Sequence, residues 1–192
     1  MKKIIVTALC LIFAFTILAF SVSRASAQDF PLERDGSESA KVSYHLAYPG
    51  LLPDHFLYPI KMIRDRIWLF LTTNKIDRSK LLLLYADKRL GAAKALIEGG
   101  KKELGLETLV KSEQYLQRVA AQLKDLDLDK ECELANQVYQ ASLKHEEIML
   151  EFEEKLDQES QKLLSENISY ARRVQEELLP CVKQESCLNC EN

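Results

Sequence analysis

The stretch that decides the fold is residues 134–156, which read LANQVYQASLKHEEIMLEFEEKL. Apolar or ring-bearing side chains recur in this stretch at intervals of three or four residues: Leu134, Val138, Ala141, His145, Ile148, Phe152 and Leu156. An α-helix turns once in about 3.6 residues, so this spacing places all of them on one face. The stretch therefore predicts a long amphipathic helix whose apolar stripe packs against other helices.

The surrounding sequence extends the same pattern. No proline occurs between Pro59 and Pro180, and the intervening residues are rich in Leu, Ala, Glu, Lys and Gln, which favour helices. We predict helices beginning near Pro59, over 77–97, over 101–124, from 127 or 129 to a break near 157–158, and from there to about 178. The alternative to that break is one continuous helix of about 50 residues, an unusual length for a compact domain. Short loops favour antiparallel neighbours, so the prediction is an all-α bundle of four to five amphipathic helices.

The first of these helices has an unusual composition. Phe56, Ile60, Ile63, Ile67 and Phe70 form one apolar face, which we expect to lie at the centre of the bundle. The basic residues of the helix and the turn after it leave two alternatives: a membrane-surface helix or a contact with a partner helix. Those residues are Lys61, Arg64, Arg66, Lys75, Arg78 and Lys80.

The N-terminal 27 residues predict export from the cytoplasm. Lys2 and Lys3 precede an apolar run from Ile4 to Phe20, and Ala25-Ser26-Ala27 offers the small residues of a cleavage site. We expect a signal peptide cleaved after Ala27 and a protein that is secreted or resident in the periplasm or cell envelope. The apolar run approaches the length that spans a bilayer, so an uncleaved anchor is the alternative.

The rest of the chain divides into three predicted parts: a flexible polar linker over 28–49, a helical bundle domain over 50–179 and a cysteine-containing tail over 180–192. The chain has 26 basic and 29 acidic residues, and three of the basic residues lie in the predicted signal. The exported part therefore has a net charge of −6, which excludes a general nucleic-acid binder with a basic surface.

Four cysteines outside the signal are candidates for structural disulfides. Cys187 and Cys190 form a Cys-x-x-Cys unit, while Cys132 and Cys181 lie at nearly equal distances from the predicted break at 157–158. In an antiparallel hairpin these last two residues reach the same level, which suggests a Cys132–Cys181 disulfide. A four-cysteine zinc site or a redox-active thiol pair in an envelope sensor is the alternative.

No pattern for catalysis is present. The chain lacks a Gly-rich phosphate loop, a Gly-x-Ser-x-Gly elbow and a His-Glu-x-x-His motif, and no His has Glu three residues before it. His145 lies on an apolar stripe, where we expect its ring to pack while one nitrogen contacts a polar neighbour; a ligand or pH-switch role is the alternative. We predict a non-catalytic binding or scaffolding protein without cofactor or metal, with an unknown protein partner and no assigned oligomeric state.

Three segments resemble a bacterial extracytoplasmic helical domain family of unknown function. They are LPDHFLYPIK at 52–61, ADKRL at 86–90 and ASLKHE at 141–146. The resemblance covers about 50–178 and leaves out the cysteine tail. Many members of that family have Pro near the position of Gln158, and its absence here distinguishes this chain. The resemblance implies an all-helical fold and an extracytoplasmic location, and it implies no activity or catalytic residue.

Overall fold

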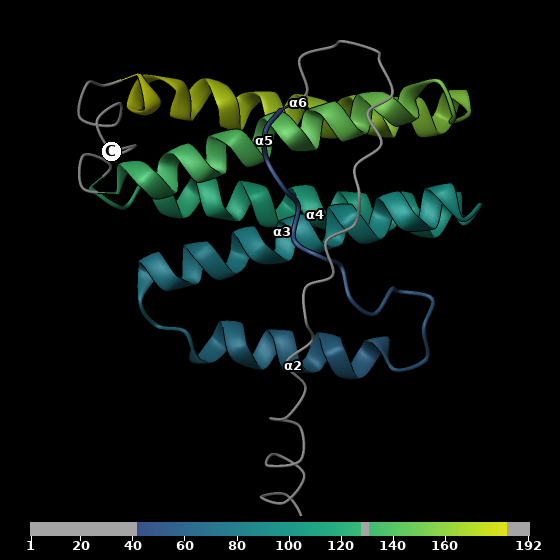
Figure 1. The fold of residues 1–192 in the computed structure, drawn as a ribbon, viewed down its shortest axis with the longest axis horizontal. Helices are drawn as coiled ribbons and strands as arrows, with labels where there is room; N and C mark the ends of the chain where they lie inside the picture. The colour runs from purple at the N-terminus through teal and green to yellow at the C-terminus, as the bar shows by residue number, and fades with distance from the viewer. Residues whose placement is uncertain (1–41, 128–130, 184–192) are drawn as a thin grey trace, which may run out of the picture. The chain divides into compact units, whose positions relative to one another are not determined.

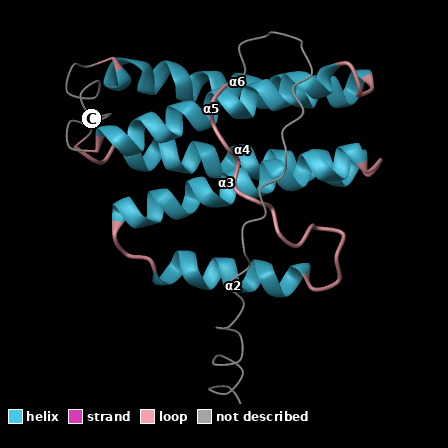
Figure 2. Cartoon of the chain, viewed as in Figure 1, coloured by secondary structure: helices cyan, strands magenta, loops and turns pink. Residues whose placement is uncertain are grey.

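The computed structural model describes residues 42–127 and 131–183. Within those residues the chain forms five α-helices and no strand (Figures 1 and 2). The helices are α2 (Tyr58–Leu71), α3 (Lys75–Glu98), α4 (Lys102–Leu123), α5 (Cys132–Glu153) and α6 (Gln158–Val182). The predicted all-α fold is confirmed. The predicted signal lies outside the described residues, as do most of the linker and tail.

Helices α3 to α6 form a four-helix bundle. The α3–α4 pair and the α5–α6 pair are each joined by a short connection, and consecutive helices run in opposite directions (Figure 1). Helix α4 also packs on α6, and α3 on α5, which closes the bundle. Among the described helices, none is both long enough and apolar enough to cross a membrane.

The break between α5 and α6 confirms the prediction near residues 157–158. Helix α5 ends at Glu153, and the Asp157 side chain accepts a hydrogen bond from the backbone N–H of Ser160 at 3.0 Å. This carboxylate caps α6, because it satisfies an N–H group that has no partner within the helix. The same bond holds the pKa of Asp157 below its ordinary value.

Two predicted helix starts differ from the structure. Helix α3 was predicted to begin at Asp77, but Asn74 caps it: its side chain accepts from the N–H groups of Ile76 and Asp77, and Asp77 lies in the first turn. Asn is as good a cap as Asp, so the sequence alone did not separate them. Helix α5 starts at Cys132, later than the predicted 127 or 129.

Glycine decides how α3 ends and how closely α4 approaches it. Gly100 has φ +81°, a conformation that ends a helix without the cost that a Cβ would add. A Cβ at Gly105 would lie 2.5 Å from Cγ1 of Ile97, so only glycine permits this close packing of α4 on α3.

The apolar core of the bundle consists of two layers with polar side chains between them. One layer includes Leu83, Leu116 and Val138, and the other includes Leu90, Leu109 and Phe152. Along α3, α4 and α5 the change from one layer to the other falls at buried charged residues, namely Asp87, Glu113 and His145. The bundle therefore has a polar layer across its middle.

Helix α2 has the opposite orientation from the predicted one. Ile60, Ile63, Ile67 and Phe70, which we call the outward stripe, are between 53% and 81% exposed. The prediction that this face lies at the centre of the bundle is wrong. The α3–α6 bundle is complete without α2, and α3 presents polar and aromatic side chains to it, so α2 packs through the side that bears Asp65.

Residues just outside the predicted bundle domain contact it or continue its last helix. Two residues of the predicted linker contact the bundle: the Tyr44 hydroxyl donates to Asp87 at 2.7 Å, and Leu46 packs against an apolar layer. At the other border, α6 continues through Pro180 to Val182, although we placed Pro180 in the tail. Pro180 falls in the last turn of α6, and the helix ends two residues after it.

The orientation of α2 predicts a contrast between two substitutions. Ile67→Ala should change the free energy of unfolding by less than about 1 kcal/mol, because the side chain is already mostly in water. Leu90→Ala, at a fully buried core position, should cost about 2–5 kcal/mol. Urea unfolding followed by circular dichroism measures both, and equal losses would contradict the outward orientation.

Candidate functional site

The most constrained side chain in the polar layer is His145 on α5. Its ring is 0% exposed, and each ring nitrogen faces a carboxylate. Nδ1 lies 2.7 Å from Oε1 of Glu113 on α4, and Nε2 lies 3.3 Å from Oδ1 of Asp87 on α3. Ionised carboxylates only accept hydrogen bonds. Both ring nitrogens can therefore donate to a carboxylate only when the ring is protonated and carries a hydrogen on each nitrogen.

The electrostatics of this site follow from burial and from the two carboxylates. Burial by itself lowers the pKa of His145, but Glu113 and Asp87 outweigh it and raise the pKa to about 9. Tyr44 also donates to Asp87, and burial together with that carboxylate raises the pKa of the Tyr44 hydroxyl well above its ordinary value. The prediction that one nitrogen of His145 contacts a polar neighbour was therefore incomplete, because both do.

This cluster is closed to solutes and links secondary-structure elements. His145, Glu113 and Asp87 are each at most 4% exposed, so a substrate has no access to the ring. Glu113 and Asp87 were missed as site residues. Their signal was present in the sequence: each is a charged residue on an apolar stripe, between Leu109 and Leu116 and between Leu83 and Leu90.

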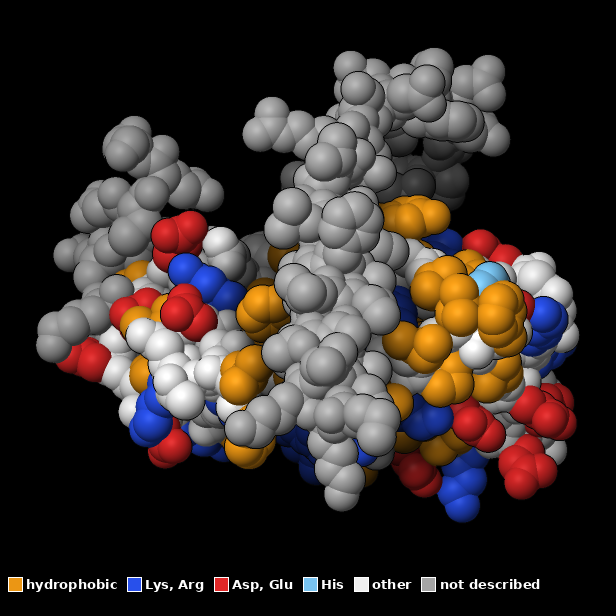
Figure 3. Space-filling model, turned by 90° about the horizontal axis from the view of Figure 1, so that it is seen from below, with side chains coloured by type: hydrophobic (Ala, Val, Ile, Leu, Met, Phe, Trp, Pro, Cys, Tyr) orange, Lys and Arg blue, Asp and Glu red, His pale blue; other side chains and the backbone are white. Residues whose placement is uncertain are grey.

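The accessible candidate is the outer surface of α2. Figure 3 shows hydrophobic side chains gathered on this side of the molecule. Trp68 is 57% exposed next to the outward stripe, and Phe56 just before the helix is 82% exposed. With 100° between successive residues, Arg64 and Arg66 fall on opposite sides of the stripe. The arrangement is an apolar surface with basic edges.

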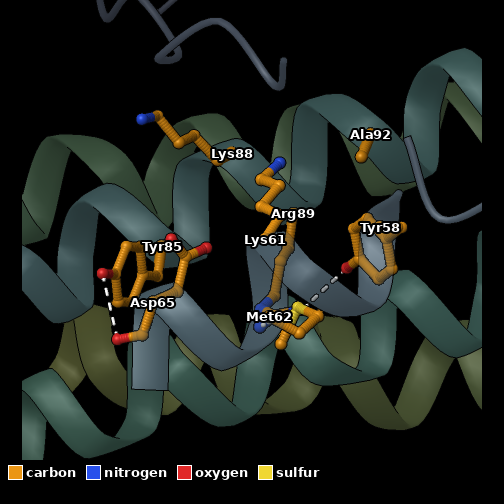
Figure 4. Close-up of a pocket in the computed structure, with 8 residues that line it drawn as sticks. All are labelled: Tyr58, Lys61, Met62, Asp65, Tyr85, Lys88, Arg89 and Ala92. Atoms are coloured by element: carbon orange, nitrogen blue, oxygen red, sulfur yellow. Dashed lines mark hydrogen bonds between the residues drawn. The ribbon is translucent and has the colours of Figure 1, made fainter. Parts of the chain in front are cut away.

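The opposite side of α2 holds the helix against α3 by polar contacts. The Tyr85 hydroxyl donates to the backbone oxygen of Asp65 at 3.2 Å, and Arg78 donates to the backbone oxygen of Leu69 at 2.9 Å. Figure 4 shows the cavity between the two helices, where Arg89 lies beside Met62 and Tyr58. Its volume is about 10 Å³, enough for one water molecule and too small for a substrate.

The cysteines do not form the predicted Cys132–Cys181 disulfide. Cys181 is a free, half-buried thiol in the last turn of α6, whereas Cys132 is buried at the first residue of α5. Equal levels in a hairpin do not make two side chains face each other, and a disulfide requires both Cβ atoms to point together. Cys187 and Cys190 lie outside the described residues, so the zinc-site and redox-pair alternatives stay predictions.

The remaining candidate metal ligands do not gather at one place in the described residues. Residues 42–127 and 131–183 contain no group of three His, Cys, Asp or Glu side chains arranged to hold a metal ion. His55 is exposed and stacks on Phe56 with ring centroids 4.9 Å apart, far in sequence from His145.

Stability should depend on pH through His145. The folded protein keeps the imidazole proton up to about pH 9, whereas the unfolded chain releases it near 6.5. The contribution is therefore complete below about pH 6.5 and is lost as the pH rises to about 9, a decrease on the order of 3 kcal/mol. Urea unfolding at pH 6, 7.5 and 9 measures it. A free energy of unfolding that is flat or rising over this range contradicts the charged ring.

Replacing the histidine should be costly at low pH. His145→Gln leaves two carboxylates in the core without a cation, so we expect a loss of about 3–5 kcal/mol at pH 6 and a smaller loss at pH 9. His55→Gln, at an exposed position, is the matched control and should change stability by less than about 0.5 kcal/mol.

Thiol reactivity should separate two of the cysteines. In the native, unreduced protein we expect iodoacetamide to alkylate Cys181 and to leave Cys132 unmodified, because Cys132 is buried and is not a free thiol. Peptide mapping by mass spectrometry identifies the modified residues. A linked peptide containing Cys132 and Cys181 would restore the pairing that the structure excludes.

Comparison with known proteins assigns the chain to a family without a function. The model of a family described as a domain of unknown function, DUF5667, matches residues 50–178. The family resemblance in the sequence covers the same range. No curated protein and no solved structure gives a significant match to the chain. Because the match covers most of the chain, the protein belongs to the DUF5667 family, whose function is unknown.

Proposed function

We propose that the protein is an extracytoplasmic, non-catalytic binding protein that docks on an anionic membrane surface through α2. The observation that supports the proposal is the outward stripe: a helix that turns its main apolar face to solvent while its polar side packs on the bundle. Apolar faces of this kind are rare on soluble proteins unless something binds them.

The charges around the stripe favour a lipid surface as the occupant. Arg64 and Arg66 are exposed and Lys61 is half-buried, while the only acidic residue of the helix, Asp65, is buried and bonds to Arg64 at 2.8 Å. Helix α2 therefore presents basic and apolar groups without an exposed carboxylate. Amphipathic helices with this composition lie in the interface of anionic bilayers, with Trp and Phe at the level of the headgroups.

The expected affinity is modest and reversible. Each stripe side chain contributes on the order of 1 kcal/mol when part of its surface leaves water, and each arginine contributes about 1 kcal/mol near an anionic leaflet. The predicted export signal supports the same proposal, since it would bring the chain to the outer side of a cell membrane. A protein partner or a second copy of the chain would use the same stripe, and the test below distinguishes these occupants from a lipid surface.

Trp68 makes the test direct, because it is the only tryptophan in the chain. We expect its emission to shift to shorter wavelength when the exported protein is mixed with vesicles of phosphatidylcholine and phosphatidylglycerol. Vesicles of phosphatidylcholine alone should give a weaker shift. Added salt should reduce the shift seen with the phosphatidylglycerol-containing vesicles. Flotation of the vesicles measures the bound fraction independently.

The variants identify the surface. Ile63→Ser with Ile67→Ser should weaken vesicle binding at least tenfold, whereas Leu150→Ser, at an exposed position on α5, should leave it unchanged. Emission that stays constant with anionic vesicles contradicts the proposal. A shift that depends on protein concentration without vesicles would assign the stripe to a second copy of the chain instead.

A further inference from the structure

Arg89 on α3 is a buried cation without an ion-pair partner among the described residues. It is 7% exposed, and its guanidinium contacts neutral acceptors only: the Tyr58 hydroxyl at 3.2 Å, the Met62 sulfur at 3.4 Å and the Tyr115 hydroxyl at 3.4 Å. Its Nε–H has no hydrogen-bond partner in the described part of the chain. Figure 4 shows the side chain between α2 and α3, beside Met62 and Tyr58.

This environment differs from that of the other buried cation, His145. Two carboxylates face His145, whereas the nearest acidic residue on α2, Asp65, bonds to Arg64 and forms no ion pair with Arg89. Removing a charge from water without a counter-charge costs several kcal/mol. A thioether is also a weak acceptor, so an oxyanion in its place would bind Arg89 more strongly.

A groove next to Arg89 is lined by further cations. It lies among α2, α3 and α4 and has a volume of about 400 Å³, and none of the described residues in its wall is acidic. Arg66, Lys111 and Arg118 line it together with Arg89. Arg89 and Arg118 both stack on the ring of Tyr115, at 4.6 Å and 5.4 Å from its centroid, so both guanidinium groups lie against the same side chain of the groove wall.

Little competes with an incoming anion for these cations. Lys111 forms an ion pair with Glu107 at 3.6 Å, but both side chains are exposed, so this pair is weak. Where the structure is described, neither Arg66 nor Arg118 has an ion pair. Guanidinium groups suit tetrahedral oxyanions, because their N–H groups can donate to two oxygens at once.

We propose that the groove around Arg89 binds a phosphate group. The phosphate either belongs to a small soluble phosphate monoester or to the headgroup of a lipid. This inference goes beyond the docking of α2 and does not depend on it, because it rests on the cations of the groove and not on the outward stripe. Arg66 connects the two surfaces, since it flanks the stripe and also lines the groove.

Calorimetric titration of the full protein with inorganic phosphate and with glycerol phosphate tests the soluble source. Sodium chloride at the same ionic strength is the blank, and phosphatidylglycerol vesicles test the lipid source. Saturable heat with either soluble phosphate would assign a soluble ligand. Binding to phosphatidylglycerol vesicles that is lost in the groove variants, without binding of soluble phosphate, would identify the lipid headgroup as the ligand.

Matched variants make the result specific. Arg118 is exposed, so the Arg118→Gln variant should fold normally. We expect this variant to bind phosphate at least tenfold more weakly. Arg173→Gln is the control, because Arg173 is also exposed and also stacks on a tyrosine ring, at 4.4 Å from that of Tyr170 on α6. Arg89→Met should abolish binding, and its circular dichroism spectrum shows whether it is folded.

The failure of this inference is separable from that of α2 docking. If Arg118→Gln and Arg173→Gln reduce binding equally, or if neither source binds saturably, the groove is not a phosphate site. Vesicle binding that is lost with Ile63→Ser and Ile67→Ser but unchanged in Arg118→Gln would retain the docking surface and exclude the lipid headgroup as the ligand of the groove. Soluble phosphate binding that persists in the double serine variant would support the groove alone.

Discussion

The interaction on which the rest of the structure depends is the contact of His145 with Glu113 and Asp87. It joins three helices of the bundle at one level and, through Tyr44, holds the segment before α2 as well. A buried charge cluster adds less stability than an apolar core of the same size, but it tolerates few arrangements. Sliding one helix by a turn would leave a charge unpaired in the core, so the cluster defines the register of α3, α4 and α5.

Because the bundle satisfies its own core, α2 is attached to it in a different way. The buried residues of the apolar layers belong to α3 to α6, and α2 is held by hydrogen bonds from Tyr85, Arg89 and Arg78 together with the packing of Leu69 against one layer. An apolar face directed inward would meet these polar groups and leave them without partners. The outward stripe is therefore a consequence of what the closed bundle offers to a fifth helix.

Periodicity predicted the helices and the break at Asp157 because both depend on local spacing and capping, which can be read along the chain. It could not predict the direction of α2, since the same stripe of isoleucines fits a core and a docking surface. It also placed Cys132 and Cys181 at one level without fixing where their side chains point. His145, Glu113 and Asp87 each interrupt an apolar stripe, and only their meeting in space identifies them as one site.

The position of Trp68 has a consequence for how unfolding of this protein is observed. The only indole lies on α2, outside the apolar layers, so its emission reports the surroundings of α2 and is insensitive to the packing of the core. Ellipticity, by contrast, sums over all helices. The two signals thus follow different parts of the chain, and their midpoints coincide only if α2 and the bundle melt as one cooperative unit.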